Sequence, residues 1–128
     1  MCIRDSLGAD AVLAADTDSL AVRATEGNRT LNDCSEQRLK VALGSMETLQ
    51  ALLAGRRADL LLCNILAPVI EALSPGFESL IAPNGRALLS GLLVDQAPRL
   101  KEVLKTQGWR VTQELAQGRW GLLEIRHT

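Results

Sequence analysis

Aromatic side chains are scarce in this 128-residue chain, which has one phenylalanine, two tryptophans and no tyrosine. Proteins that bind single-stranded nucleic acid stack the bases on several aromatic rings, and this sequence offers too few of them. Charge of one sign is missing as well, because 14 lysines and arginines balance 15 acidic residues for a formal net charge of −1. A near-neutral chain has no electrostatic footprint for nucleic acid or anionic lipid, so neither is an expected partner.

Long hydrophobic runs, paired cysteines and histidine clusters are also absent. The longest uncharged apolar stretch, residues 60–68, is far shorter than the roughly 20 residues that cross a membrane. The three cysteines (Cys2, Cys34 and Cys63) form no CxxC pair and no signal peptide is apparent, so we expect free thiols in a reducing cytoplasm. With His127 as the only histidine, no metal site is expected.

Strands and helices are predicted to alternate along the chain. Hydrophobic residues make up 47% and charged residues 23%, as in ordinary globular domains, and the length suits one domain. Strands separated by helices indicate an α/β fold with a parallel sheet, to which a closing hairpin adds antiparallel strands. The predicted strands are residues 11–15, 38–43, 58–63 and 87–93, the helices 18–31, 46–53, 67–80 and 95–107, and the hairpin 109–115 with 120–125.

The helix at residues 18–31 is predicted to be capped by Asp18 or Ser19, whose side-chain oxygen can accept the first free N–H groups. Its inward face is predicted to carry Leu20, Ala24 and Leu31, which fall on one side of a helix.

Three further local features are predicted from residue type. The strand at residues 58–63 has no polar alternation at its centre, which indicates burial on both faces. Pro75 is expected to break the helix at 67–80, and residues 83–85 (Pro-Asn-Gly) to form a turn.

Asp16 is the clearest candidate for a binding role. Ligands of open parallel sheets bind beyond the carboxyl ends of the strands, and Asp16 ends the first predicted strand. A carboxylate there can accept hydrogen bonds from both hydroxyls of a ribose. The alternative is that Asp16 only caps the following helix, although Asp18 is better placed to do so.

Asn64 follows the third strand, where its amide offers both a donor and an acceptor. A turn or capping role for the next helix is an equally good interpretation from spacing alone. Ser45, with Gly44, follows the second strand, and Ser90 lies late in the fourth beside Gly91. Loop or core positions explain these two serines more simply than ligand binding does.

A glycine-rich phosphate loop is missing, since the ten glycines form neither G-x-G nor G-x-x-x-x-G-K. In nucleotide-binding sheets that loop follows the first strand, but residues 11–15 are followed by Asp-Thr-Asp. We therefore interpret residues 11–15 as the second strand of such a sheet, whose first strand and loop are absent. That strand and residues 58–63 are then expected to pair directly or to expose unpaired edges.

Three segments resemble the PrmA family of ribosomal protein methyltransferases. Residues 7–9 and 12–22 resemble the family's second strand and helix, and residues 59–68 resemble its motif D-hydrophobic-A-N-I-L-A-P. Residues 80–93 are similar to its segment L-x-P-G-G-x-L-x-L-S-G-I-L. The likeness runs from residue 7 to about residue 126. Residues 1–6 match nothing in the family, so we expect a foreign start followed by a partial domain at 7–128.

The resemblance implies a Rossmann-like, seven-stranded methyltransferase sheet, N-terminally truncated without its first strand and glycine loop, and closed by an antiparallel hairpin. It implies S-adenosylmethionine as the cofactor and amines of a large-subunit ribosomal protein as the substrate. By resemblance Asp16 holds the ribose hydroxyls, and Asn64 lies near the methionine end and orients the incoming amine. Ser45 is a further candidate cofactor contact from its place after the second strand. No residue is assigned as the general base.

Two other functions compete with methyl transfer. A fragment of a nicotinamide-dependent oxidoreductase would share the acidic residue at the strand end, and a truncated sheet could lack enzymatic activity altogether. The block around Asn64 and the closing hairpin favour methyl transfer. The missing loop predicts that this chain alone is weakly active or inactive.

Overall fold

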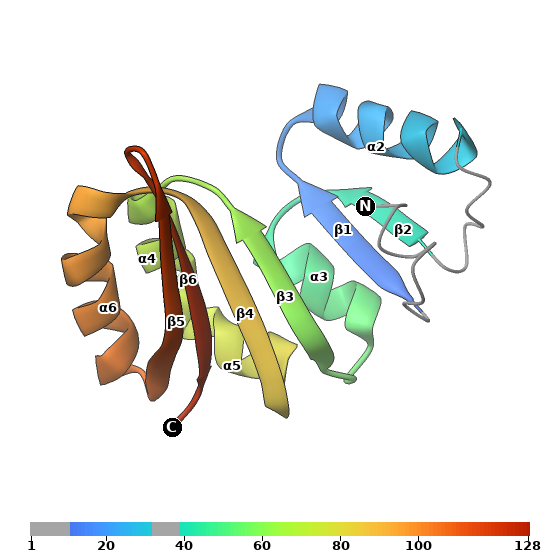
Figure 1. Ribbon diagram of the computed structural model, residues 1–128. Coiled ribbons are helices and arrows are strands. Elements are labelled where there is room, and N and C mark those ends of the chain that lie inside the picture. The colour runs from blue at the N-terminus through green and yellow to red at the C-terminus, as the bar shows by residue number, and fades with distance from the viewer. Residues whose placement is uncertain (1–10, 32–38) are drawn as a thin grey trace. The chain divides into compact units, whose positions relative to one another are not determined.

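A computed structural model describes residues 11–31 and 39–128 (Figure 1). The chain forms two compact units, residues 1–55 and residues 56–128. The predictions for Cys2, Cys34 and residues 1–9 lie outside the described residues.

The first unit contains a two-stranded parallel sheet. It consists of β1 (Val12–Asp16), α2 (Ser19–Leu31), β2 (Leu39–Leu43) and α3 (Met46–Leu53), close to the predicted bounds. The strands pair from Val12 with Leu39 to Asp16 with Leu43. Helices α2 and α3 lie on the two sides of this pair (Figure 1).

The predicted inward face of α2 is wrong. Leu20 and Leu31 are 70% and 82% exposed, whereas Val22 is buried. The packed side is fixed by Val22 and by Arg29, whose guanidinium donates a hydrogen bond to the Leu39 carbonyl at 3.2 Å. A two-stranded sheet covers only a narrow stripe of the helix, so the remaining apolar residues stay in contact with water.

The structure confirms one of the two residues that were predicted to cap α2. The Leu20 N–H donates to Oδ1 of Asp18 at 2.9 Å. Asp18 therefore satisfies one of the free donors of the first turn, which leaves Asp16 outside the cap.

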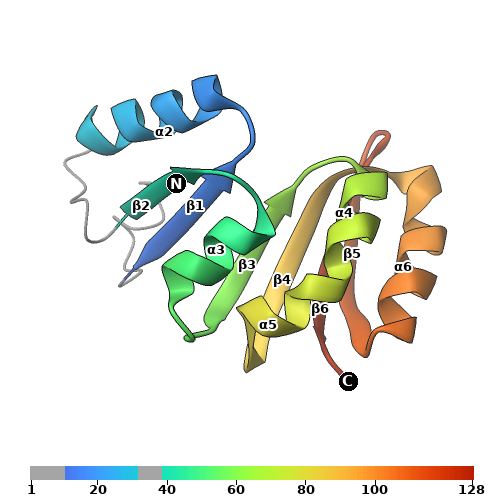
Figure 2. The same cartoon turned by 180° about the vertical axis from the view of Figure 1, so that it is seen from behind.

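The second unit is a four-stranded mixed sheet with the order β3-β4-β6-β5. β3 and β4 are parallel, and β4-β6 and β5-β6 are antiparallel, which confirms the predicted closing hairpin. Helices α4, α5 and α6 lie on one face of this sheet (Figures 1 and 2). The elements are β3 (Ala58–Asn64), α4 (Ala67–Leu73), η1 (Ser74–Gly76), α5 (Phe77–Leu80), β4 (Ile81–Leu93), η2 (Val94–Gln96), α6 (Ala97–Thr106), β5 (Trp109–Gln117) and β6 (Trp120–His127).

The core of the second unit lies between the sheet and its helices. Phe77 and Trp109, both fully buried, meet edge to face with ring centroids 6.5 Å apart. The predicted break at Pro75 is confirmed, because a 3-10 turn separates α4 from α5 there. That turn directs Phe77 into the core.

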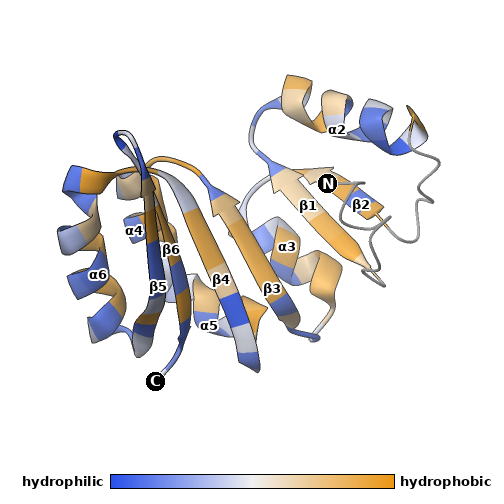
Figure 3. Cartoon of the chain, viewed as in Figure 1, coloured by the Kyte–Doolittle hydropathy of each residue, from blue (hydrophilic) through white to orange (hydrophobic). Residues whose placement is uncertain are grey.

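Two predictions for the strands of this unit are wrong. β3 is not buried on both faces, since Leu62 is 39% exposed. β3 is an edge strand, and only one sheet face is covered by the helices of the unit (Figures 1 and 3, where β3 and β4 are mainly hydrophobic). Residues 83–85 lie within β4 rather than in a turn, and the pairing jumps from Ala58–Ile81 to Leu60–Arg86. The Pro-Asn-Gly segment is thus accommodated as an irregularity inside a strand.

The alternative prediction, that the strands at residues 11–15 and 58–63 expose unpaired edges, is confirmed. Among the described residues β1 pairs with β2 alone and β3 with β4 alone. No helix in residues 11–31 or 39–128 is long and apolar enough to cross a membrane. Within the same ranges no cluster of three or more His, Cys, Asp or Glu residues could hold a metal ion.

Candidate functional site

Asp16 ends β1 with an exposed carboxylate. Its Oδ1 accepts the Asp18 N–H at 2.8 Å, which closes a short turn, and its carbonyl accepts the Gly44 N–H at 2.8 Å. The second carboxylate oxygen has no partner among the described residues. Because Asp18 caps α2, the capping alternative for Asp16 is wrong, and a free anionic acceptor remains at the strand end.

Gly44 and Ser45 lie beside Asp16, because Asp16 is paired with Leu43 at the end of β2. A side chain at Gly44 would overlap the Thr48 hydroxyl, so this turn requires glycine. Ser45 is the N-cap residue of α3, but its hydroxyl makes no capping hydrogen bond. The structure therefore brings two of the predicted cofactor contacts, Asp16 and Ser45, to one edge of one sheet.

Asn64 ends β3 and is exposed. It is aligned with Ser90 of β4, and its side chain makes no hydrogen bond to the described residues. Helix α4 begins after the N-cap residue Leu66 without a side-chain cap, so the capping alternative for Asn64 is wrong. The donor and the acceptor of the Asn64 amide are both free for a ligand.

Ser90 and Gly91 support the segment that follows Asn64. The Ile65 N–H donates to the Ser90 carbonyl at 3.2 Å, and Gly91 has φ +81°. The structure thus brings Asn64, Ser90 and Gly91 together in the second unit, with Ser90 acting through its backbone.

Neither the cysteine nor the histidine of the second unit supplies a base beside Asn64. Burial raises the pKa of the Cys63 thiol to about 11, so this thiol is protonated at neutral pH and does not act as a base. His127 packs on Trp109, with ring centroids 4.1 Å apart. It ends β6, which runs antiparallel to β4, so His127 lies at the opposite end of the sheet from Asn64.

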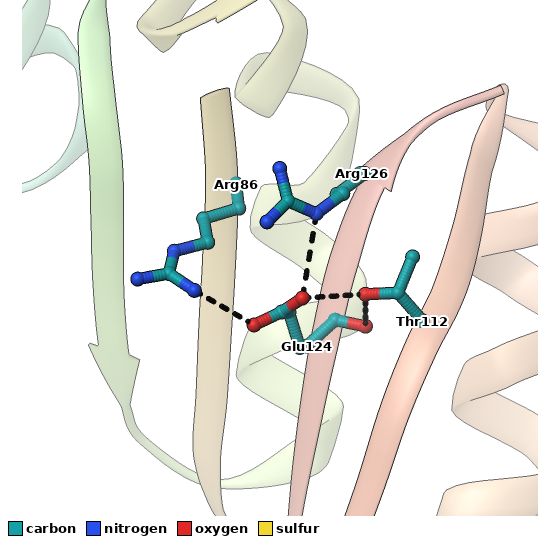
Figure 4. Close-up of polar contacts among 4 residues, drawn as sticks. All are labelled: Arg86, Thr112, Glu124 and Arg126. Carbon is teal, nitrogen blue, oxygen red and sulfur yellow. Dashed lines mark hydrogen bonds and ion pairs between the residues drawn. The ribbon is translucent and has the colours of Figure 1, made fainter. Parts of the chain in front are cut away.

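A buried acidic residue, Glu124, was not anticipated from the sequence. It is 6% exposed and accepts hydrogen bonds from Thr112 Oγ1 at 2.7 Å, Arg86 Nη1 at 3.1 Å and Arg126 Nε at 3.4 Å (Figure 4). The Thr112 hydrogen bond and then the two arginines hold its pKa below the usual range, against the effect of burial.

This cluster is structural rather than catalytic, because both carboxylate oxygens of Glu124 are occupied. Thr112 sits at an irregularity of the β5-β6 pairing, between Val111 and Gln113, which turns its hydroxyl toward Glu124. The period-two spacing of Glu124 and Arg126 is the one signal in the sequence that points to a charged strand face.

Comparison with known proteins gives a consistent result over almost the whole chain. The profile of the family "Ribosomal protein L11 methyltransferase (PrmA)" matches residues 4–128. A ribosomal protein L11 methyltransferase of Parasynechococcus marenigrum is 74% identical over 120 residues, which are 94% of this chain and 42% of that protein. The chain therefore spans less than half the length of this relative.

Solved structures agree in fold. The ribosomal protein L11 methylase of Lactobacillus delbrueckii subsp. bulgaricus is 29% identical with a TM-score of 0.80, covering 97% of this chain and 61% of that one. The magnesium protoporphyrin IX methyltransferase of Synechocystis PCC 6803, solved with bound SAH, is 12% identical with a TM-score of 0.65, covering 92% and 64%. The second likeness shows the Rossmann-like methyltransferase fold alone. Together with the match of the profile to residues 4–128, these findings show that the chain belongs to the ribosomal protein L11 methyltransferase (PrmA) family.

Proposed function

We propose that this chain is the cofactor-binding part of an S-adenosylmethionine-dependent protein methyltransferase that acts on ribosomal protein L11 in the cytoplasm. The observation that carries the proposal is the exposed, unpaired amide of Asn64 at the carboxyl end of β3. The family match supports methyl transfer over the nicotinamide-dependent alternative, which shares only the acidic residue at the strand end.

Asp16 fits the ribose of the cofactor. One carboxylate oxygen is held by the Asp18 N–H, which fixes the orientation of the group, and the other is free to accept a hydroxyl. The neighbouring Ser45 hydroxyl makes no capping hydrogen bond, so it is available as a second contact. A hydrogen bond to a charged acceptor contributes about 1.5–3 kcal/mol, so Asp16 is expected to dominate this part of the site.

Asn64 fits the position of the incoming amine. S-adenosylmethionine, when bound, supplies a methyl group on a positively charged sulfur. Held by Asp16 and Ser45, the cofactor would supply this methyl group to the amine nitrogen and be released as S-adenosylhomocysteine. The Asn64 carbonyl oxygen can accept an N–H of the neutral amine and aim its lone pair, which is catalysis by orientation.

The amine must lose a proton to water before attack, because a free lysine is largely protonated at pH 7. No described side chain is assigned as its base. The chain's contribution to the reaction is therefore placed in alignment of the amine rather than in proton transfer.

Cofactor binding by the chain alone is tested by calorimetric titration with S-adenosylmethionine. Because the sequence has no G-x-G loop, we expect no binding in the micromolar range. A micromolar dissociation constant would contradict the predicted weakness of the isolated chain.

The site residues are tested in a chimaera in which the 120 aligned residues replace those of the Parasynechococcus relative. Asn64→Ala is expected to lower kcat for methylation of ribosomal protein L11 by about 10²-fold, the effect of removing one polar group that aligns the reacting atoms. Asp16→Asn is expected to raise KM for S-adenosylmethionine by about tenfold or more. The matched controls are Asn84→Ala and Asp59→Asn, which alter exposed residues of the same types elsewhere.

Two results would count against the proposal. The first is an unmodified chimaera that does not methylate the ribosomal protein. The second is an Asn64→Ala variant whose kcat equals that of Asn84→Ala.

A further inference from the structure

The bulge in β4 brings Gly91 against the segment that carries Asn64. Leu89 pairs with Leu123 and Leu92 with Gly121, so two residues of β4, Ser90 and Gly91, stand opposite a single residue of β6. Such a bulge bends the strand and turns its extra residue out of the ladder. On its other side β4 pairs with β3, where Ser90 is aligned with Asn64. The bulge therefore lies directly beside the turn that follows β3.

A side chain at position 91 would collide with this turn. A Cβ on Gly91 would lie 2.7 Å from Oδ1 of Asn64, 2.8 Å from the Ile65 nitrogen and 2.8 Å from the Ile65 oxygen. A Cβ atom essentially never comes within 3.0 Å of a non-bonded heavy atom, so all three approaches are too close. Two of the three atoms belong to the backbone and cannot move without displacing the turn.

Three of the four other described glycines with positive φ do not share this crowding, and the fourth, Gly44, would meet only the side chain of Thr48. Gly55 (φ +87°) and Gly118 (φ +60°) have open space where a Cβ would stand, and Gly108 (φ +87°) would meet only Thr128 Oγ1, at 3.9 Å. These three positions require glycine for backbone conformation alone. At Gly91 (φ +81°), atoms of Asn64 and Ile65 lie where a side chain would have to stand.

We propose that Gly91 is the positioning residue for Asn64. The missing side chain leaves room for the Asn64 amide oxygen and the Ile65 peptide, and the Ile65 N–H to Ser90 carbonyl hydrogen bond then fixes the turn. Gly91 touches neither cofactor nor substrate in this proposal and acts through Asn64. The inference rests on the proposed function of Asn64.

The geometric part is tested by NMR on the 128-residue chain. In the unmodified chain, nuclear Overhauser effects are expected between the Gly91 Hα protons and the Ile65 amide proton, and their absence would overturn the proposal. Gly91→Ala is expected to shift the Asn64 side-chain amide resonances and to speed hydrogen exchange at Ile65.

The matched control for this measurement is Gly108→Ala, which imposes a comparable positive-φ strain in the same unit. It is expected to leave the Asn64 and Ile65 resonances in place. Equal shifts in the two variants would overturn the proposal, since backbone strain alone would then explain them.

The functional part is tested by a double-mutant cycle in the chimaera. Gly91→Ala is expected to lower kcat on the order of 10²-fold, as displaced catalytic groups do, with little change in KM for S-adenosylmethionine. In an Asn64→Ala background the same substitution is expected to have almost no further effect, because the group that it displaces is gone. A purely structural role would instead give the same loss in both backgrounds.

The outcomes separate this inference from the proposed function. If Asn64→Ala leaves kcat unchanged, the proposed function fails. If Asn64→Ala lowers kcat but Gly91→Ala behaves like Gly108→Ala, or remains harmful in the Asn64→Ala background, the positioning role of Gly91 fails alone.

Discussion

The two units differ sharply in how much apolar surface they bury. In the described part of the first unit the buried hydrophobic residues are Val22, Leu39 and Leu53, while Leu20, Leu31 and Leu43 are largely exposed. In the second unit, helices on one sheet face enclose a continuous core. Its buried members are Ala67, Ile70, Phe77, Leu80, Ile81, Ala87, Leu89, Leu92, Ala97, Leu100, Leu104, Trp109, Leu123 and Ile125.

The difference teaches that strand number, rather than hydrophobicity of the individual elements, decides where a core forms. Both units contain apolar strands and amphipathic helices. The two-stranded sheet offers the helices on its two sides a narrow surface, whereas the four-stranded sheet offers its helices a wide one. The second unit is therefore expected to hold most of the stability of the isolated chain.

The largest effect is expected from Phe77→Ala. It removes a fully buried ring that packs on Trp109, so it should lower the free energy of unfolding of the second unit by about 3–5 kcal/mol. Both tryptophans lie in this unit, so urea titration followed by tryptophan fluorescence reports on it directly. The control Leu115→Ala, at an exposed site, should change it by less than about 0.5 kcal/mol.

The comparison itself is tested by hydrogen exchange. Amides at the centre of β4 and β6, such as those of Leu89 and Leu123, should exchange roughly a hundredfold more slowly than those of β1 and β2, such as Ala14. Equal protection in the two sheets would show that the first unit is as stable as the second, and the argument from strand number would be lost.

A smaller effect, dependent on pH, is expected at Glu124. The contacts of Glu124 hold its pKa below the usual range. The stability that these contacts provide is therefore complete at any pH above the ordinary carboxyl pKa of about 4.3. It is lost as the pH falls through the lowered pKa of Glu124. Glu124→Gln should therefore lower the melting temperature of the second unit at neutral pH, and the gap to the unmodified chain should narrow below about pH 4. A gap that stays constant down to pH 2 would show that the charge of Glu124 does not matter.

The smallest effect is expected in the first unit, from Asp18→Ala. Loss of the hydrogen bond from the Leu20 N–H should destabilise α2 by about 1 kcal/mol. The measurement is hydrogen exchange in α2, with Ser19→Ala as the control. Tryptophan fluorescence should not respond to either variant, and a response would mean that the two units do not behave separately.

Local rules were sufficient for most of the fold. The positions of the strands, the break at Pro75 and the closing hairpin followed from periodicity and from proline and glycine chemistry. The exposed face of α2 and the half-buried β3 did not, because burial depends on which neighbours are present and on how many strands the sheet has. The Pro-Asn-Gly sequence at residues 83–85 predicts a turn. No local signal in the sequence shows that these residues form an irregularity within a paired strand.

The candidate site, too, was predicted from the sequence only in part. The rule for carboxyl ends of strands found Asp16, Ser45 and Asn64, and the structure removes the capping alternative for Asp16 and Asn64. The contact of Gly91 with Asn64 could not be predicted, since it joins two strands through a bulge. The pairing of Glu124 with Arg86 was hidden for the same reason, because the two residues are 38 positions apart.

The β4 bulge also has a consequence for how this strand tolerates insertion and deletion. Leu89 and Leu92 are both fully buried although they are three positions apart, which an uninterrupted two-residue alternation would forbid. The bulge absorbs the extra residue, so a one-residue deletion at 90–91 would leave Leu89 and Leu92 two positions apart and on the same face of a regular strand. The burial pattern of β4 is therefore compatible with a shorter strand, whereas the space that Asn64 occupies depends on the bulge, so the length of this segment matters to the candidate site more than to the core.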